Sequence, residues 1–341
     1  MHTSLFSLNN GILGAADLQS VIDIIRRDGT VVIPTETVYG LAANALSSDA
    51  IQKIFIAKGR PSDNPLIVHI ASENDISHYV QMPSKQAQQL MAHFWPGPLT
   101  LICQKKENIP PSVTAGRNTV AIRVPANPVM IQCIEASGVP LAAPSANIST
   151  RPSATDFRSV YEDLYGKVDA IIDGGVCDLG LESTVVDVTV SPFVILRPGY
   201  ITQQAIEAVI GEQCEIFSSV SHESVVKSPG MKYKHYAPHT PLTVISGDTS
   251  AEILKHTKRL IAQFEKNNKK VLLMSTVYTD SYDTPYHQKL GSDLHDIARN
   301  LFMILRNADH MEIDHILFEP VPKQGIGIAI MNRLEKAAQK E

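Results

Sequence analysis

The chain has 341 residues, of which 44% are hydrophobic and 19% charged, and this balance is typical of a globular protein long enough for two domains. The formal net charge of −5 argues against binding nucleic acid over a broad basic surface, although it leaves room for a local basic pocket. The four cysteines are widely spaced and include no CxxC pair, so we expect buried free thiols in a reducing compartment and neither a disulfide framework nor a metal site.

No targeting signal is evident at the start of the chain. The first residues do not place a basic segment before an apolar run, so we expect no signal peptide. No apolar run approaches the roughly 20 residues that a membrane-spanning helix needs. We therefore predict a cytoplasmic protein.

Helix and strand patterns alternate over the first 210 residues. Apolar residues at helical spacing predict the helices, and short apolar runs predict the strands. In chain order we predict a helix at 18–27, a strand at 30–33, a helix through Ile51 and Phe55 that ends at Lys58 and Arg60, a strand at 66–70, a helix at 84–94, a strand at 99–103, a loop at 105–118, a strand at 120–124, a helix at 129–136, a strand at 141–143, a helix at 157–165, and strands at 170–172, 183–188 and 194–196. This alternation predicts an α/β domain with a mixed, twisted sheet over residues 14–210.

The character of the chain changes over residues 211–240. The run SPGMKYKHYAPHTP at 228–241 is proline-bounded, basic and aromatic, whereas a flexible linker is expected to be rich in Gly and Ser. We interpret this linker as an ordered strap that closes over an anionic ligand in the active site.

A second, smaller α/β domain is predicted over residues 241–341. Its pattern is a strand at 242–245, a helix at 251–264, a strand at 271–274, a helix at 293–305, a strand at 316–318 and a helix at 326–336. Three strand–helix units of this kind predict a small Rossmann-like, doubly wound domain. It has neither GxGxxG nor GxxxxGK[ST], so nothing marks it as a nucleotide binder by itself.

The densest polar stretch lies between two predicted strands, at residues 34–65. Thr35, Glu36 and Thr37 follow the first strand directly, and we expect Thr35 to contact a ligand because open α/β sheets bind ligands at strand ends. The alternative is that these residues cap the following helix. His69 lies in the second strand, where a lone histidine is more often a packed side chain than a ligand contact.

Four cations lie at or near strand and helix ends of the first domain, each beside a proline, a glycine or a strand terminus. They are Lys58, Arg60, Arg123 and Arg197. Arginine offers a planar fork to a carboxylate or phosphate, and lysine offers a compact charge. The alternative for any one of them is a solvated surface charge.

A polar loop follows the strand at 141–143. Ser145, Asn147, Ser149 and Ser153 bring short hydroxyl and amide side chains, and the backbone N–H groups of such loops can surround phosphate oxygens. The alternative is an ordinary turn built from its usual residues.

The sequence contains no HExxH element, no paired His/Cys cluster and no GxSxG element. We therefore expect neither a metal site made by protein side chains alone nor a serine nucleophile. Positioning and charge neutralisation suit nucleotidyl transfer, in which cations and Mg²⁺ stabilise the charge on phosphates.

Seven motifs, in this order, resemble those of the threonylcarbamoyl-AMP synthase family. They are PTETVYGL (34–41), KGRPSDNPL (58–66), WPGPLT (95–100), VAIRVP (120–125), PSANIS (144–149), GLESTVVD (180–187) and ILRPG (195–199). The strap and the small domain after it resemble the long form of this family. The resemblance covers the chain from about residue 14 onward and implies a YrdC-like fold for the first domain.

The resemblance also implies an activity. The family condenses L-threonine, bicarbonate or CO2, and ATP into threonylcarbamoyl-AMP and pyrophosphate. Mg²⁺ enters with ATP and is held mainly by the ATP phosphates. Downstream transferase proteins then pass the threonylcarbamoyl group to the adenosine beside the anticodon of tRNA. The resemblance therefore implies that those proteins are partners of this chain. Weak direct contact with tRNA or other RNA is a further expectation.

The family's motifs carry two sets of site residues onto this chain. The ATP-binding set is Lys58, Arg60, Asn64, Thr119, Ser145, Asn147, Ser153, Arg197 and Tyr236, of which Lys58 and Arg60 would be catalytic. The threonine-binding set is Thr35, His69, Arg123, Ala143 and Ser183, with Arg123 taking the carboxylate. The chain departs from the family at Thr150, where many members have glycine, and at Ile148, so Ser149 is not carried over.

Two alternatives come from other functional classes. One is a double-stranded RNA or tRNA-binding module without catalysis, which the acidic net charge disfavours. The other is a carbamoyl-transferring enzyme that uses carbamoyl phosphate. Enzymes of that kind carry additional zinc-binding segments, which the absence of a CxxC pair argues against.

Overall fold

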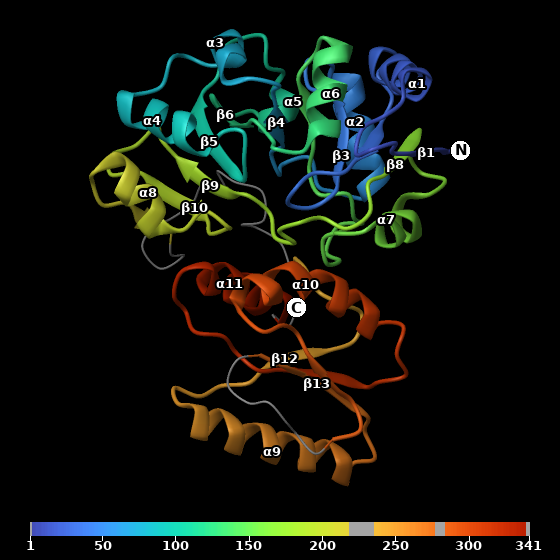
Figure 1. The fold of residues 1–341 in the computed structure, drawn as a ribbon, viewed down its shortest axis with the longest axis vertical. Coiled ribbons are helices and arrows are strands. Elements are labelled where there is room, and N and C mark those ends of the chain that lie inside the picture. The colour runs from blue at the N-terminus through green and yellow to red at the C-terminus, as the bar shows by residue number, and fades with distance from the viewer. Residues whose placement is uncertain (1, 218–234, 277–283, 339–341) are drawn as a thin grey trace. The chain divides into compact units, whose positions relative to one another are not determined.

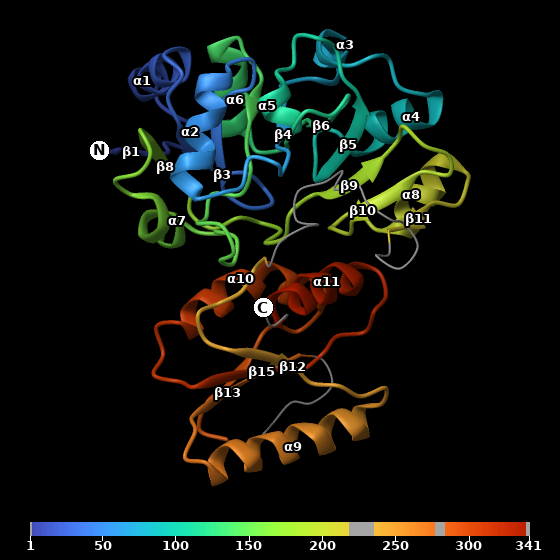
Figure 2. The same cartoon turned by 180° about the vertical axis from the view of Figure 1, so that it is seen from behind.

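The computed structural model describes residues 2–217, 235–276 and 284–338 in two compact units. The first unit comprises residues 2–149, 153–178 and 182–217. The second comprises the described residues from 235 onward together with two short segments, Thr150–Pro152 and Leu179–Leu181. Figures 1 and 2 show the elements of both units from opposite sides. Most of the predicted strap lies outside the described residues.

The first unit is built on an 11-stranded sheet in the order β1-β8-β2-β3-β7-β4-β6-β5-β9-β10-β11. Its strands are β1 (Ser4–Ser7), β2 (Val31–Ile33), β3 (Gly40–Asn44), β4 (Ile67–His69), β5 (Leu99–Gln104), β6 (Thr119–Arg123), β7 (Leu141–Ala142), β8 (Ala170–Asp173), β9 (Thr184–Asp187), β10 (Val194–Arg197) and β11 (Glu215–Ile216). Parallel and antiparallel pairs both occur: β4 runs parallel to β6 but antiparallel to β7. The predicted mixed sheet is confirmed.

Helices pack on both faces of this sheet and cover one of the two faces along most of its width. They are α1 (Ala15–Arg26), α2 (Ser48–Lys58), α3 (Ile76–Tyr79), α4 (Lys85–Phe94), α5 (Pro111–Thr114), α6 (Pro128–Ser137), α7 (Phe157–Leu164) and α8 (Gln203–Ile210), with a 3-10 turn at Glu73–Asp75. Strand residues of one parity, such as Val68 and Ile122, pack with apolar residues of α2, α4, α5, α7 and α8. On the opposite face, α1 and α6 cover only the end that contains β8, β2, β3 and β7.

The remaining part of that opposite face has a small apolar cluster of its own. Its five buried residues all come from strands: Ile67, Ile102, Ala121, Val185 and Leu196. Among the described residues, no helix contributes to this cluster. Because side chains alternate along a strand, His69, Thr119 and Arg123 share this face with their neighbours Ile67 and Ala121. We call it the open face.

The second unit is a four-stranded parallel sheet in the order β12-β15-β13-β14. Its elements are β12 (Leu242–Val244), α9 (Ser250–Lys266), β13 (Val271–Ser275), β14 (His287–Lys289), α10 (Leu294–Ala308), β15 (His315–Phe318) and α11 (Ile326–Ala338). Ile253 and Ile261 of α9 pack on one face of this sheet, and α10 and α11 lie on the other (Figures 1 and 2). The predicted doubly wound arrangement is confirmed.

Several elements differ from the prediction. The region 105–118 is not entirely a loop, because Pro111–Thr114 form the short helix α5 with proline at its first position. β1, β3, α3, α8, β11 and β14 were not predicted. The signal for α8 is present in the sequence, since Thr202 caps its start and Gly211, at φ +72°, ends it.

Candidate functional site

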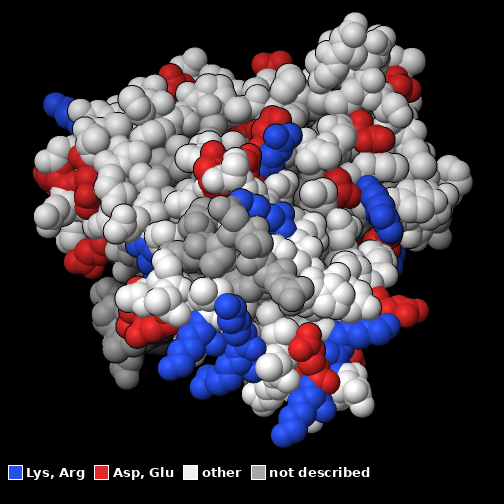
Figure 3. Space-filling view, turned by 60° about the horizontal axis from the view of Figure 1, so that its bottom comes forward, with Lys and Arg blue, Asp and Glu red and all other residues white. Residues whose placement is uncertain are grey.

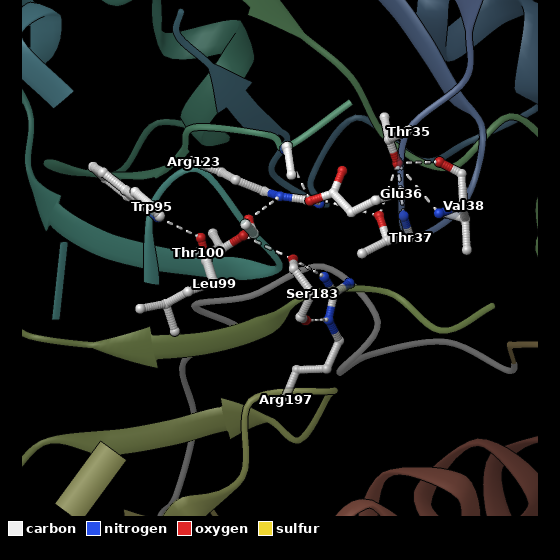
Figure 4. A network of polar contacts seen from close by, with 12 residues as sticks. Thr35, Glu36, Thr37, Val38, Trp95, Leu99, Thr100, Arg123, Ser183 and Arg197 are labelled. Carbon is white, nitrogen blue, oxygen red and sulfur yellow. Dashed lines mark hydrogen bonds and ion pairs between the residues drawn. The ribbon is translucent and has the colours of Figure 1, made fainter. Parts of the chain in front are cut away.

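Arg123 is the centre of charge on the open face. It ends β6 and is only 3% exposed. Its Nε donates to the carbonyl of Gly97 (3.0 Å), Nη1 donates to Thr37 Oγ1 (3.1 Å), and Nη2 donates to Glu36 Oε1 (2.5 Å). Figure 4 shows Glu36 and Thr37, from the segment after β2, facing this guanidinium. A buried arginine fixed in this way is suited to recognise a carboxylate.

His69 lies beside Arg123, because β4 and β6 pair in parallel with these two residues in register. Burial lowers the pKa of His69 to about 3, and the nearby positive charge of Arg123 acts in the same direction. The imidazole is therefore neutral near pH 7. Its Nδ1 is buried and has no hydrogen-bond partner.

Thr35 organises the segment between β2 and β3. Its Oγ1 donates to the carbonyl of Val38 (2.6 Å), accepts from the N–H groups of Thr37 (3.2 Å) and Val38 (3.3 Å), and lies 2.8 Å from Thr37 Oγ1. The helix-cap alternative is wrong, because strand β3 follows this segment. The next helix, α2, is capped by Ser47, whose side chain accepts from the N–H of Ala50.

The same segment also contacts the polar loop after β7. The carbonyl of Tyr39 accepts from the N–H of Ala146 (2.7 Å), and the N–H of Tyr39 donates to the carbonyl of Ala154 (2.9 Å). The structure therefore places the Arg123 cluster and the predicted phosphate-binding loop on two sides of one short segment.

Lys58 ends α2 and reaches this polar loop. Its side chain is buried, and Nζ donates to the carbonyls of Ser145 (2.5 Å) and Asn147. In return the N–H of Ser149 donates to the Lys58 carbonyl (2.9 Å). Within the loop, Ser145 Oγ donates to Asn147 Oδ1 (2.5 Å). The structure thus brings three residues of the predicted ATP set into direct contact.

Arg60 and Asn64 lie just before β4. Arg60 Nη2 donates to the carbonyls of Asn64 (3.3 Å) and Pro65 (3.1 Å). Asn64 is buried, and its Oδ1 has no hydrogen-bond partner. Thr119 begins β6 on the open face, at the opposite end of that strand from Arg123.

Ser183 and Arg197 form another hydrogen-bonded cluster, in addition to those around Arg123 and Lys58. Arg197 Nε donates to the Ser183 carbonyl and Nη2 to Ser183 Oγ, both at 3.1 Å. Ser183 Oγ also lies 2.8 Å from Thr100 Oγ1. This cluster joins a residue of the predicted ATP set to one of the threonine set (Figure 4).

The remaining predicted residues are placed separately. Ser153 Oγ donates to the buried carboxylate of Glu182 (2.5 Å). The N–H of Ala143 donates to the Ile67 carbonyl at the edge of the open face (2.9 Å). Tyr236 belongs to the second unit, where its ring stacks on Phe302 with centroids 5.3 Å apart. Its role at the nucleotide stays a prediction.

Sequence reasoning missed Glu36, Thr37, Thr100 and Glu182 as partners of site residues. A signal existed for Glu36 and Thr37, which stand within four residues of a buried strand. No local signal reveals Thr100, because its contact with Ser183 depends on the pairing of β5 with β9.

Three further findings concern metal ligands, membrane-spanning helices and cysteines. Over residues 2–217, 235–276 and 284–338, no group of three or more His, Cys, Asp or Glu side chains could hold a metal ion, and no helix is long and apolar enough to cross a membrane. All four cysteines are free and buried, as expected, and burial raises the pKa of Cys103 and Cys133 to about 12.

Three of the unpartnered buried polar atoms make this region a candidate ligand site. Glu36 Oε2, Asn64 Oδ1 and His69 Nδ1 are buried without a hydrogen bond, and such atoms usually have a partner in folded proteins. Together with the buried arginines they define a class: an α/β protein that binds small anionic or zwitterionic ligands at the strand ends of a mixed sheet.

Comparison with known proteins specifies the class further. The family model described as "Telomere recombination" (Sua5_yciO_yrdC) matches residues 23–199, and the model described as "Threonylcarbamoyl-AMP synthase, C-terminal domain" matches residues 201–339. The threonylcarbamoyl-AMP synthase of Pyrococcus abyssi is 47% identical, covering 92% of each chain. That of Bacillus subtilis is 44% identical, covering 92% of this chain and 91% of its own.

A solved structure of P. abyssi Sua5 complexed with L-threonine is also similar. It has a TM-score of 0.91 and 44% identity, covering 99% of this chain and 98% of its own. The chain belongs to the threonylcarbamoyl-AMP synthase family, and it is an enzyme of the nucleotidyltransferase class.

Proposed function

We propose that this enzyme condenses L-threonine, bicarbonate or CO2, and ATP into threonylcarbamoyl-AMP and pyrophosphate. The observation that carries the proposal is the segment from Thr35 to Tyr39. It contacts the anion-recognising Arg123 cluster on one side and the Lys58-bonded loop on the other. An amino-acid site and a phosphate site that adjoin in this way suit a reaction between an amino acid and ATP.

The difficulty of this reaction is electrostatic. The threonine amine adds to CO2 and loses a proton, which gives a carbamate anion. A carbamate oxygen then attacks the α-phosphorus of ATP, and pyrophosphate leaves with the electrons of the broken P–O bond. Both reactants are anions, so holding them together requires positive charge and fixed geometry. Lys58 and Arg60 are the cations that we assign to the nucleotide, and Arg123 is the one we assign to the threonine carboxylate.

Mg²⁺ is proposed to enter as the Mg²⁺–ATP substrate. Phosphate oxygens are the hard ligands that Mg²⁺ prefers, and it often binds through substrate phosphates with few protein ligands. When bound, it neutralises charge on the phosphates.

The product is proposed to serve the threonylcarbamoyl modification of tRNA beside the anticodon, through separate transferase proteins. Direct RNA contact would be weak and electrostatic. Figure 3 shows Lys and Arg side chains gathered toward the lower part of the view. The exposed cations of α9 are Lys255, Lys258, Arg259 and Lys266. Any RNA affinity they provide should fall steeply as salt is raised.

The test is pyrophosphate release from ATP and Mg²⁺ by the full chain, with threonine and bicarbonate omitted in turn. We expect release only when both are present. Release without threonine would indicate another acceptor or a simple ATPase. Binding of ATP without release under any combination would move the assignment to a binding module.

A further inference from the structure

One oxygen of the Glu36 carboxylate accepts two hydrogen bonds, and the other oxygen accepts none. Oε1 accepts from Arg123 Nη2 (2.5 Å) and from the N–H of Ala126 (3.1 Å). Oε2 is buried and has no hydrogen-bond partner. Figure 4 shows one oxygen facing the Arg123 guanidinium and the other turned away from it. Since an unsatisfied charged oxygen is costly in a buried place, it indicates a missing donor.

Two opposite charges therefore lie side by side on the open face, at Arg123 and Glu36, with exposures of only 3% and 7%. An α-amino acid carries the complementary pair, because its carboxylate and ammonium are attached to one carbon. The neutral side chains beside them, Thr37 and His69, add no net charge. A zwitterion is therefore the ligand whose charges are matched, whereas a simple carboxylic acid satisfies only the arginine.

We propose that Glu36 is a specificity-determining residue whose Oε2 accepts a hydrogen bond from the ammonium group of the amino-acid substrate, while Arg123 binds the carboxylate. This inference rests on the proposed function for the identity of the amino acid. It gives Glu36 a role beyond holding Arg123 in place, and this role makes the site select amino acids over carboxylic acids that lack the α-ammonium group.

The test compares two ligands that differ only at the α-carbon, L-threonine and 3-hydroxybutyrate, which has a hydrogen in place of the ammonium and so offers Glu36 no donor there. Their affinities are measured by calorimetry for the full-length wild type and for Glu36→Gln. The glutamine amide oxygen can still accept from Arg123 and Ala126, so the arginine keeps its partners. We expect the variant to lose about tenfold or more in threonine affinity while its affinity for 3-hydroxybutyrate changes little.

A purely positional role predicts a different result. If Glu36 only orients Arg123, the variant weakens both ligands equally and the ratio of affinities stays at the wild-type value, which overturns the proposal. Glu36→Asp retains the charge, so it should keep a preference for threonine closer to that of the wild type. It also serves as the second variant should Glu36→Gln fold poorly.

Asp169→Asn is the matched control. Asp169 is a partly buried carboxylate of the first unit that precedes β8, and it accepts from the N–H (2.8 Å) and hydroxyl (3.1 Å) of Thr30. Its neutralisation should leave the ligand ratio unchanged. The wild type could instead bind another amino acid and not threonine. If Glu36→Gln then lost affinity for that amino acid, the result would refute the proposed function but support this inference.

Discussion

At the scale of single residues, the site depends on buried charges that are held by neighbours. Arg123, Lys58 and Arg197 all donate to backbone carbonyls or hydroxyls of adjacent segments. Each of them therefore both positions a loop and supplies positive charge. Substitutions separate the two roles, because loss of the positioning hydrogen bonds lowers the unfolding free energy, whereas loss of the positive charge lowers the catalytic activity.

Lys58 and Arg60 should respond differently to truncation. Arg60→Ala should cost at least about 2–3 kcal/mol of transition-state stabilisation, the scale of losing a preorganised donor. Lys58→Met should cost a similar amount and should also lower the unfolding free energy, because two buried carbonyls lose their donor. Steady-state pyrophosphate release and urea unfolding measure the two effects. Near-normal turnover in both variants would refute the role assigned to these cations.

The buried, neutral His69 predicts the direction in which the unfolding free energy changes with pH. Its folded-state pKa is about 3, whereas an unfolded histidine titrates near 6.5. Below pH 6.5 the unfolded chain takes up a proton that the folded chain does not, so stability is lost as the pH falls toward 3, by up to about 1.4 kcal/mol per pH unit. Above pH 6.5 this residue makes no contribution to the pH dependence.

Urea unfolding of the wild type and His69→Gln at pH 7, 6 and 5 measures this contribution. The variant should show the shallower loss of stability on acidification. His93→Gln, at an exposed position of α4, is the control for general effects of removing a histidine. Equal slopes for His69→Gln and the wild type would contradict the buried neutral state.

Thr150 stands in a strained conformation, with φ at +79°. A β-branched residue is unfavourable in the left-handed region, where glycine is at ease. Thr150→Gly should therefore raise the unfolding free energy by about 0.5–1 kcal/mol, after allowing for the greater chain entropy of glycine. Thermal unfolding of this variant beside Thr150→Ala provides the comparison. A glycine variant no more stable than the alanine variant would show that the backbone conformation carries no cost.

At the scale of elements, the segment Leu179–Leu181 is held closely against α10 within the second unit. A Cβ at Gly180 would lie 2.4 Å from both Arg299 Cα and its carbonyl oxygen, and the backbone φ is +73°. Gly180→Ala should therefore destabilise by more than about 2 kcal/mol, since backbone must move in addition to the φ penalty.

Gly211→Ala is the matched control, because its φ is +72° but nothing lies within 4 Å of an added Cβ. It should show only the conformational cost, about 1 kcal/mol. Urea unfolding gives both values. Equal losses in the two variants would mean that the close approach at Gly180 relaxes freely.

The elements also show which signals a sequence carries. Strands such as Ile67–His69 and helices such as α2 were predictable, because their apolar spacing and the residues at their ends give clear sequence signals. β3 was not, since Gly40–Asn44 consists largely of small residues and becomes a strand by pairing with β2 and β7. β14 carries polar residues only, so no apolar run marks it.

At the scale of the whole molecule, the sequence predicts the types of the candidate site residues but not their partners. Cations and hydroxyls at predicted strand ends indicate an anion site through residue type and position alone, and the motifs assign them to two ligands. The contacts between Arg197 and Ser183, or between Arg123 and Glu36, depend on sheet order and on a segment that joins two regions. Pairings between residues about 14 to 90 positions apart have no local signature.

The unpartnered atoms Glu36 Oε2, Asn64 Oδ1 and His69 Nδ1 have a consequence for the life of the protein in the cell. A ligand that satisfies them binds only the folded chain, so it shifts the folding equilibrium by mass action, by about 2.7 kcal/mol at a hundredfold excess over Kd. Degradation often acts on the unfolded fraction. The amount of enzyme that survives should therefore follow the supply of its ligands, so that a shortage of the proposed amino-acid substrate lowers both the turnover and the number of molecules able to perform it.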